Sequence, residues 1–403
     1  MPSRDVAIYS PRSVHWYERR GGRGGGAERQ MMLLARALAG RGLRVGHIAF
    51  EPRDLVTLPP NLELVVRAPE SEGSSLIGGV REAVRAWRGV AEADARVTIV
   101  RMATPALGVA GLWCRIRRRR LVFSSANDRD FLVDAGPDSG PKRALYRLGL
   151  RLCDAVVVQS KDQVRLAREL VPRSREVVTI PSFCEPAPEI AGRAVEPESF
   201  LWIGRLTPEK SPERFLELAA ALPDARFVLV PVPPASAPVD SSDMREAARD
   251  LPNLTVSDAL PHGELMQLVA RAAAVVNTSS VEGMPNVFLE AWARGVPALT
   301  LRCDPDGVIT RRGLGVAADG SWDSFVAGAR ELWDGRHERA ELSQRTLAYI
   351  EEVHSLEAVA ERWAAVVARL AASGAAPKRA QAAAKEAEPE TEMHGRIDGD
   401  HRR

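Results

Sequence analysis

The sequence predicts an α/β protein built from two Rossmann-like domains whose mainly parallel sheets face a central cleft. Short apolar segments alternate with helical segments in two separate series, as expected for parallel sheets covered by helices. A proline-rich stretch divides the two series. The loops that carry glycine-rich or charged motifs all follow predicted strands. The chain has 403 residues, 45% of them hydrophobic, which is long enough for two cores.

The first series of elements occupies residues 1–182 and predicts the N-terminal domain. Its expected strands are 6–9, 45–50, 62–66, 97–100, 121–124, 155–158 and 177–180. A helix that ends near Ala39 carries an apolar stripe of Met31, Leu34 and Leu38, which is the spacing of a buried helix face.

Residues 183–197 form the predicted linker, because proline and small or charged residues replace the apolar periodicity there. The second series covers residues 198–354 and predicts the C-terminal domain. Its expected strands are 200–203, 226–230, 254–257, 272–277 and 297–301. A helix from Pro212 to Leu222 follows the first of them, with Ser211 as the expected N-cap.

A terminal amphipathic helix is expected over residues 355–372, packing back toward the N-terminal domain. Val359, Trp363 and Leu370 lie on its inward face. Residues 373–403 are rich in alanine and charged residues and contain no aromatic residue, which predicts a disordered tail.

Composition narrows the functional class. The formal net charge is +2, from 55 basic and 53 acidic residues, so a nucleic-acid partner is not expected. The four cysteines lack Cys-x-x-Cys or Cys/His ligand spacing, which argues against a disulfide framework or a zinc site. No signal peptide or apolar run of about 20 residues is evident. We therefore expect a cytoplasmic protein, at most at the inner face of the membrane.

Glu282 and Glu290 lie on either side of a strand-to-helix turn. The apolar run 272–276 precedes this turn, and the next helix begins at Pro285 or Asn286. Eight helical steps place the two Cα atoms about 12 Å apart, beyond the roughly 5 to 10 Å of paired glycosidase carboxylates. The spacing suits two acceptors that hold the ends of an elongated, hydroxyl-rich ligand such as a nucleotide sugar. The alternative is two solvated charges.

Residues 21–26 form a glycine-rich loop after the first strand. Glycine lets backbone N–H groups approach a diphosphate closely. The pattern Gly22-x-Gly24-x-x-Ala27 also matches a relaxed dinucleotide fingerprint, with Glu51 as the ribose acid. However, about eleven residues separate this loop from the strand, whereas a Rossmann turn begins at the strand end. A flexible surface loop is an equal alternative.

A second loop, residues 204–212, places Arg205 and Lys210 between a buried strand and a helix N-terminus. Two cations and the helix dipole could converge there and neutralise a leaving diphosphate without a metal. The alternative is a pair of solvated surface charges. The three loops together predict a cleft between the domains.

These segments resemble the group 1, or family 4, glycosyltransferases, which are retaining enzymes with the GT-B fold. The resemblance spans roughly residues 5–370. The matching segments are Gly25–Gln30, Asp154–Ser160, Gly204–Leu206 with Lys210, Glu282–Trp292 and Gly295–Pro297.

The resemblance implies a role for each matching position. Arg205 and Lys210 would bind the diphosphate, Glu290 the ribose, and Glu282 the donor sugar. The segment bordering sugar and phosphate would be Gly283, Met284, Pro285, Asn286 and Val287, with Gly25 and Gly26 closing from the N-terminal, acceptor-binding domain. The C-terminal domain would bind the nucleotide sugar. The resemblance implies no metal and no other cofactor, in agreement with the lack of a suitably placed Asp-x-Asp motif.

Two departures from the family pattern bear on specificity. Many relatives carry a sugar-contacting histidine in the N-terminal domain, but this chain has none between His47 and His262. Asn127 or Asp128 would take its place on the acceptor side; Asp128 could orient an acceptor hydroxyl as a catalytic residue, or it could be a capping residue. Residues 230–234 replace a glycine-containing turn, so the choice of nucleotide stays open.

Residues 115–120 form a basic run after the apolar stretch 106–113. Such a patch could rest on anionic lipid and hold a polyprenyl-diphosphate-linked acceptor near the cleft. The alternative, slightly favoured, is the basic end of a helix that enters the next strand.

Together with these residues, the resemblance implies a metal-independent retaining transferase that moves a hexose-type unit from a nucleoside diphosphate sugar to a glycan, lipid-linked or small-molecule acceptor. Cell-surface polysaccharide or glycoconjugate synthesis is the expected setting. One alternative is an NAD(P)- or flavin-dependent oxidoreductase that uses the Gly22-x-Gly24 loop. Another is a non-catalytic nucleotide-sugar- or glycan-binding relative.

Overall fold

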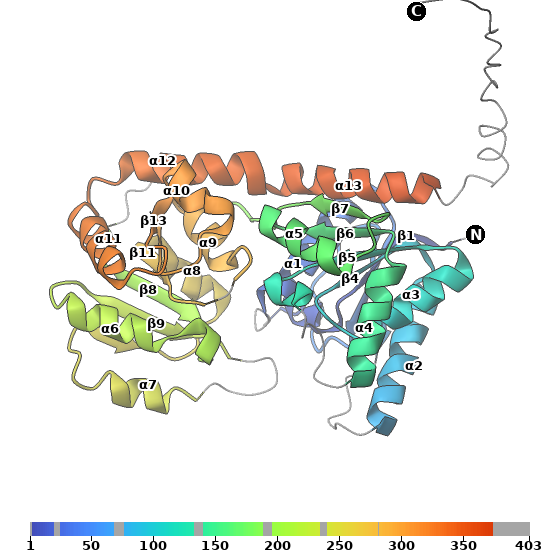
Figure 1. The fold of residues 1–403 in the computed structure, drawn as a ribbon, viewed down its shortest axis with the longest axis horizontal. Coiled ribbons are helices and arrows are strands. Elements are labelled where there is room, and N and C mark those ends of the chain that lie inside the picture. The colour runs from blue at the N-terminus through green and yellow to red at the C-terminus, as the bar shows by residue number, and fades with distance from the viewer. Residues whose placement is uncertain are drawn as a thin grey trace, which may run out of the picture.

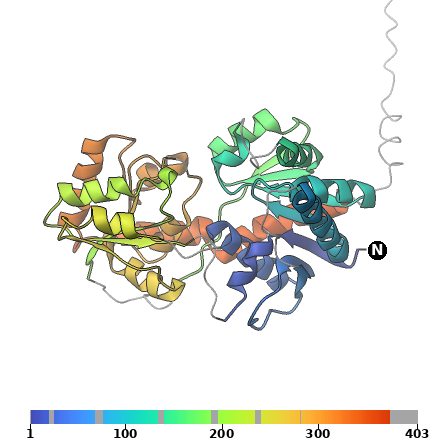
Figure 2. The ribbon, with the colours of Figure 1, turned by 90° about the horizontal axis from the view of Figure 1, so that it is seen from below.

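The computed structural model describes residues 2–19, 25–67, 76–132, 140–187, 196–233, 240–280 and 282–373. They form two α/β lobes that lie side by side, with the C-terminal helices running along both (Figure 1). A view turned by 90° shows the same two lobes and the same connecting helices behind them (Figure 2). The predicted fold class is confirmed. The predicted tail, most of the glycine-rich loop and the centre of the predicted linker lie outside the described residues.

The N-terminal lobe contains a seven-stranded parallel sheet with the order β3-β2-β1-β4-β5-β6-β7. Its strands are β1 Arg4–Tyr9, β2 Val45–Phe50, β3 Leu62–Arg67, β4 Ala95–Arg101, β5 Arg120–Ser124, β6 Ala155–Val158 and β7 Glu176–Thr179. Its helices are α1 Gly26–Gly40, α2 Leu76–Ala93, α3 Ala106–Arg117, α4 Gly140–Leu152 and α5 Lys161–Leu170, with short 3-10 turns η1 Pro11–Trp16 and η2 Asp128–Phe131. The central strands are apolar on both faces because helices cover both sides.

The C-terminal lobe contains a six-stranded parallel sheet with the order β10-β9-β8-β11-β12-β13. Its strands are β8 Ser199–Gly204, β9 Phe227–Pro231, β10 Leu254–Val256, β11 Ala272–Asn277, β12 Ala298–Thr300 and β13 Gly315–Ala317. Its helices are α6 Glu213–Ala221, α7 Ser242–Ala247, α8 His262–Ala270, α9 Asn286–Trp292, α10 Val308–Arg312, α11 Trp322–Asp334 and α12 Ala340–Tyr349, with 3-10 turns η3 Pro208–Lys210 and η4 Pro305–Gly307.

Two local features differ from the sequence predictions. Strand β13 was not predicted, because three residues beginning with a glycine give no alternating pattern. The glycine is needed there: Gly315 has φ +146°, and a Cβ on it would lie 1.9 Å from the carbonyl oxygen of Ala298. The predicted N-cap role of Ser211 is wrong. Turn η3 comes first, Ser211 adopts φ +45°, and its hydroxyl donates to the carbonyl of Pro208 at 3.0 Å.

The chain crosses between the lobes a second time at the π-helical turn η5, Ile350–His354, before α13, Leu356–Ser373. Val359, Trp363 and Leu370 of α13 are buried in one core with residues of α1, as the sequence predicted. His354 joins the two crossings: its Nδ1 lies 2.7 Å from the carbonyl oxygen of Ser182, and its own carbonyl accepts from the N–H of Cys184 at 2.8 Å. Burial lowers the pKa of His354 to about 4, so the imidazole is neutral.

Candidate active site

A cleft of about 1790 Å³ lies between the two lobes, where the carboxyl ends of strands from both sheets meet. Phe50 ends β2 and Met102 follows β4 on one side, while Gly204, Pro231 and Asn277 end strands on the other. The lining includes the predicted site residues Gly25, Gly26, Asn127, Arg205, Lys210, Glu282, Gly283, Met284, Pro285, Asn286, Val287 and Glu290. The folded chain therefore brings three predicted loops into one cavity.

Lys210 forms an ion pair with Glu282 within the C-terminal lobe. The hydroxyl of Ser279 donates to the same carboxylate oxygen of Glu282 at 3.0 Å. The main chain of Lys210 is also fixed, because Thr278 donates to its carbonyl at 2.7 Å and Trp202 donates to the Thr278 hydroxyl at 2.9 Å. A buried strand and the loop after β11 thus hold this cation in place. Arg205 is exposed on the same loop.

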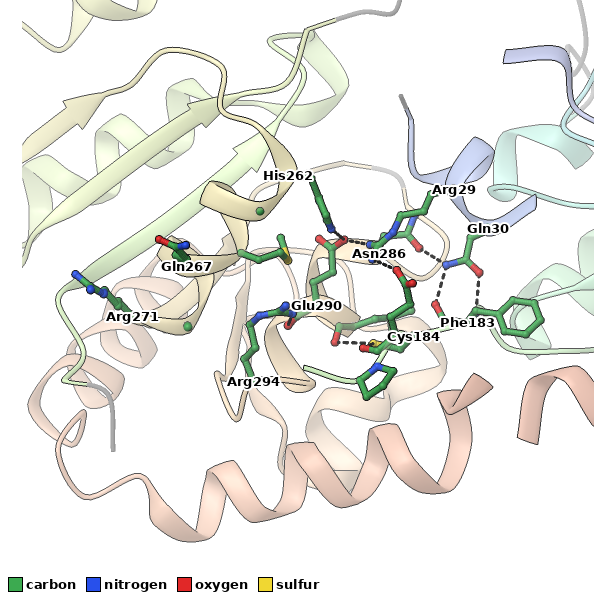
Figure 3. Close-up of a pocket in the computed structure, with 16 residues that line it drawn as sticks. Arg29, Gln30, Phe183, Cys184, His262, Gln267, Arg271, Asn286, Glu290 and Arg294 are labelled. Atoms are coloured by element: carbon green, nitrogen blue, oxygen red, sulfur yellow. Dashed lines mark hydrogen bonds and ion pairs between the residues drawn. The ribbon is translucent and has the colours of Figure 1, made fainter. Parts of the chain in front are cut away.

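Glu290 forms its ion pair across the cleft. Arg29 of α1 pairs with Oε1 of Glu290 and, through its other terminal nitrogen, with Oε2 of Glu185 at 2.6 Å. His262 approaches the same Glu290 oxygen at 3.9 Å. Burial lowers the pKa of His262 although Glu290 opposes this shift. Figure 3 shows Arg29 and His262 directed toward Glu290.

The first turns of α1 and α9 are in direct contact. A Cβ on Gly26 would lie 1.8 Å from Nδ2 of Asn286, so only glycine fits without displacing that amide. Gln30 donates to Oδ1 of Asn286 at 3.1 Å and exchanges two hydrogen bonds with the main chain of Phe183, at 2.8 and 2.6 Å. Residues of both lobes and of the start of the linker therefore meet at one point (Figure 3).

The loop after β5 forms part of the N-terminal side of the cleft. Asp130, buried in this loop, accepts hydrogen bonds from the N–H groups of Ala103 at 3.2 Å and Ala126 at 2.7 Å and from the hydroxyl of Ser125 at 3.2 Å. Burial raises its pKa, and these donors oppose the shift. The loop is thus held by a carboxylate below it, which leaves Ala126 and Asn127 at the cleft surface.

Asp128 is the one predicted site residue that does not line this cleft as described. Its Oδ1 accepts from Nε2 of Gln163 at 3.0 Å, and burial raises its pKa. The capping role considered for Asp128 is wrong, because the residue that caps η2 is Asn127, whose side chain accepts from the N–H of Arg129 at 2.9 Å. A Cβ on Gly283 would lie 2.9 Å from Nε2 of Gln163, so Asp128 and Gln163 stand beside the 282–290 segment.

The sequence interpretation assigned no role to Trp16, Arg29, Gln30 or His262. Arg29 and Gln30 belong to a matching segment, and their position in the first turn of α1, three and four residues after Gly26, is a local signal for contact with the cleft. Their partners Glu290 and Asn286 lie more than 250 residues away, so no local pattern could name them.

Within the described ranges, no group of three His, Cys, Asp or Glu side chains could hold a metal ion. No helix in that part of the chain is both long and apolar enough to cross a bilayer. All four cysteines are free thiols.

Comparison with known protein families identifies the family of this chain. The family described as "Glycosyl transferases group 1" matches residues 185–348, and the "Glycosyl transferase 4-like domain" matches residues 25–182. Together they cover both lobes. The chain belongs to the group 1 glycosyltransferases. No curated protein matches the sequence.

Solved structures share the GT-B fold at low sequence identity. Sucrose-phosphate synthase from Thermosynechococcus elongatus is 15% identical over 91% of this chain and 99% of its own, with a TM-score of 0.73. WaaG, a glycosyltransferase involved in lipopolysaccharide biosynthesis, is 15% identical over 90% of this chain and 99% of its own, with a TM-score of 0.65. An E. coli protein described as trehalose-6-phosphate bound with UDP-2-fluoro glucose is 14% identical over 90% and 98%, with a TM-score of 0.65.

Proposed function

We propose that this group 1 glycosyltransferase transfers a sugar from a nucleoside diphosphate sugar to an acceptor hydroxyl, with retention of anomeric configuration and without a metal ion. The observation that carries the proposal is the 282–290 segment, hereafter the donor segment. It presents the Lys210–Glu282 pair at one end and the Arg29–Glu290 pair at the other, within one cleft. Two carboxylates at the ends of a lined cleft suit an elongated ligand that is rich in hydroxyl groups.

The leaving diphosphate would lie near Lys210 and Arg205. Breaking the bond between the anomeric carbon and the diphosphate oxygen leaves negative charge on the diphosphate, and a cation held beside it stabilises that charge. Lys210 is held by Glu282 and, through its main chain, by Thr278. Arg205 adds a second positive charge from the same loop. These groups can neutralise the diphosphate themselves, which supports the metal-free part of the proposal.

The nucleoside would lie at the other end of the donor segment. Glu290 would accept hydrogen bonds from the ribose, and residues 230–233 would form the wall beside the base. Val232 donates to the carbonyl of Gly204 at 2.8 Å, which fixes this wall against β8. The UDP-2-fluoro glucose named for one protein of the same fold supports a nucleoside diphosphate sugar as the donor class.

A binding panel with UDP, GDP, ADP, their sugar derivatives and NAD tests the donor class by isothermal titration calorimetry. We expect one nucleoside diphosphate and its sugar derivative to bind, and binding of NAD alone would contradict the proposal. Turnover of the bound donor, with the product anomer read by NMR and EDTA present throughout, tests retention and metal independence. Binding without turnover on any acceptor extract would favour the non-catalytic alternative.

The family match makes the chain a transferase and argues against the oxidoreductase alternative. Gly22 and Gly24 lie outside the described residues. Glu51, which this alternative would use for a ribose, is exposed beyond β2 and is not among the described residues that line the cleft.

We further propose that the acceptor is lipid-linked, and this proposal rests on exposed side chains of two adjacent helices of the N-terminal lobe, α2 and α3. At the end of α3, Leu112 and Ile116 are 40% and 68% exposed, and Arg115, Arg117 and Arg118 are exposed beside them. On α2, which packs against α3, Val80, Val84 and Trp87 are also exposed. Apolar side chains among cations suit an anionic lipid surface. We propose that these side chains bring the enzyme to lipid-linked acceptors in cell-surface polysaccharide or glycoconjugate synthesis.

The structure also sharpens the test of membrane binding. Arg119 and Arg120 are paired with Asp94 and Asp154, so they are not the residues to change. Replacing Ile116, Arg117 and Arg118 with serine should reduce co-sedimentation with liposomes containing phosphatidylglycerol at low salt. The control changes two exposed arginines of the other lobe, Arg226→Ser and Arg330→Ser. Equal sedimentation of both variants would remove the membrane proposal and leave the transferase proposal intact.

A further inference from the structure

We propose that Arg29 is a positioning residue of the donor site, which holds Glu290 for the donor ribose and makes nucleotide binding depend on both lobes. The inference rests on the proposed function, because it takes Glu290 as the ribose acceptor. It adds a residue from the opposite lobe to a site that otherwise belongs to the C-terminal lobe.

The contacts of Arg29 fix its guanidinium on two sides. Its two terminal nitrogens pair with Glu290 and Glu185, and its side chain is only 12% exposed. The ring of Trp16 lies 5.5 Å from the guanidinium carbon, in cation–π range, and Trp16 packs edge-on to His262 with ring centroids 5.6 Å apart. A planar cation held in this way presents a fixed donor to Glu290.

Glu290 keeps access to a ligand while it is paired. The two described contacts of its carboxylate, with Arg29 and His262, both involve Oε1. Glu290 lines the cleft, so a ribose hydroxyl can donate to the other oxygen, Oε2. Binding would then add a hydrogen bond to the pair instead of replacing Arg29.

The Arg29–Glu290 pair also makes the proposed ribose site depend on contact between the lobes. Arg29 lies one turn after Gly26, and Gln30 beside it is bonded to Asn286 and to the main chain of Phe183. If the lobes separate, the first turn of α1 leaves α9 and the Glu290 carboxylate loses its cation. A partly buried carboxylate that loses its cation carries an uncompensated charge and is no longer held in one orientation toward the ribose. Ribose recognition is thus expected to be complete only when the lobes are docked.

The same ion pair could also oppose nucleotide binding, and the effect of removing Arg29 on affinity would then have the opposite sign. If Arg29 occupied the ribose position, the nucleotide would have to break the pair on binding, and removing Arg29 would tighten binding. The two possibilities are separated by one substitution, Arg29→Met, which removes the charge and keeps most of the side-chain length.

The test measures the affinity of a nucleoside diphosphate and of its 2′-deoxy and 3′-deoxy analogues by isothermal titration calorimetry. In the wild-type protein, at least one analogue should bind about 10-fold more weakly, the size of one hydrogen bond to a charged group. Arg29→Met should weaken the ribonucleotide about 10-fold and reduce this discrimination, while Arg29→Lys should recover part of both. Arg41→Met is the matched control, because Arg41 at the other end of α1 also pairs with a glutamate, Glu357.

Each outcome decides the inference. Unchanged affinity and discrimination in Arg29→Met, or tighter binding, would overturn it. If Arg29→Met does not fold, Glu185→Gln replaces it. This variant removes the charge of one of the two partners of Arg29, so it should weaken ribonucleotide binding about threefold and reduce the discrimination against the deoxy analogues. Wild-type values for both would overturn the inference. Failure of the wild-type protein to bind any nucleoside diphosphate would instead contradict the proposed function.

Discussion

Glu282 and Glu290 stand at the two ends of one segment, but their ion pairs are built differently. Glu282 is paired with Lys210 of the same lobe, and Ser279 and Thr278 complete a local network around them. Glu290 is paired with Arg29 of the other lobe, and Glu185 of the linker shares that cation. The Glu282 end of the donor segment, proposed to hold the sugar, is therefore organised within one lobe, whereas the Glu290 end, proposed to hold the nucleoside, needs both. Substitutions at the two ends should have different consequences.

The largest expected effect is at the Lys210 end. Lys210→Met should lower turnover by about 100-fold or more, since it removes a preorganised cation beside the leaving diphosphate. Steady-state kinetics with saturating donor measure this loss. Lys142→Met, on α4, is the control and should keep wild-type turnover. Wild-type turnover in Lys210→Met would contradict the assigned role.

The next effect concerns the connection between the lobes. His354 and His47 each have a pKa lowered by burial to about 4, against 6.5 for the free side chain. The unfolded chain therefore binds more protons between these values, so stability is present above pH 6.5 and is lost as pH falls toward 4. On going from pH 7 to pH 5, each histidine should lower the free energy of unfolding by about 2 kcal/mol.

Urea denaturation at pH 7 and pH 5 measures this loss. His47 lies inside the N-terminal lobe, where its ring pairs with the hydroxyl of Tyr17 at 2.8 Å, while His354 lies at the crossing. Replacing His354 with glutamine should therefore reduce the loss of unfolding free energy between pH 7 and pH 5 by about 2 kcal/mol. An unchanged pH dependence would exclude His354 as a source.

A smaller effect separates the two glutamates directly. Glu290→Ala should weaken binding of the nucleoside diphosphate about 10-fold, because it removes a charged acceptor for the ribose. Glu282→Ala should weaken binding of the sugar-bearing donor more than binding of the nucleoside diphosphate, because Glu282 is the proposed sugar contact. Calorimetry with both ligands makes the comparison, with the exposed Glu264→Ala as the control. Equal losses for both ligands in both variants would remove the distinction between the two ends.

The smallest effect is at Ser279. Ser279→Ala removes the hydroxyl that donates to Glu282 at 3.0 Å, and it should lower kcat/KM about fivefold, or roughly 1 kcal/mol. Affinity for the nucleoside diphosphate should not change, because the Glu290 end is not touched. A change in that affinity would show that the two ends are coupled more closely than their ion pairs indicate.

The positions of most strands could be predicted from the sequence, because parallel strands that are buried on both faces appear as short apolar runs. The 45–50 and 272–277 segments coincide with β2 and β11. Strand β13 was missed because three residues that start with glycine carry too little signal. Ser211 was misassigned because the sequence before α6 does not reveal that an extra 3-10 turn comes first.

The candidate site was only partly accessible for a different reason. The matching motifs located the C-terminal side of the cleft, where Arg205 and Lys210 lie close in sequence to a strand end. The partner of a charged side chain is set by the packing of the lobes, so the sequence could not pair Arg29 with Glu290. Burial of Asp130 beneath its loop is likewise a three-dimensional property, so the sequence indicated its neighbours Asn127 and Asp128 and not Asp130 itself.

The bond between Ser182 and His354 has a mechanical consequence. The polypeptide passes between the lobes along two paths, and His354 fastens these paths to each other. Two fastened connections resist sliding of one lobe past the other but permit rotation about the line that runs through them. We expect such a rotation only when the contacts of Arg29 with Glu290 and of Gln30 with Asn286 are released, and a small twist at this line would then displace surfaces farther from it by a larger distance.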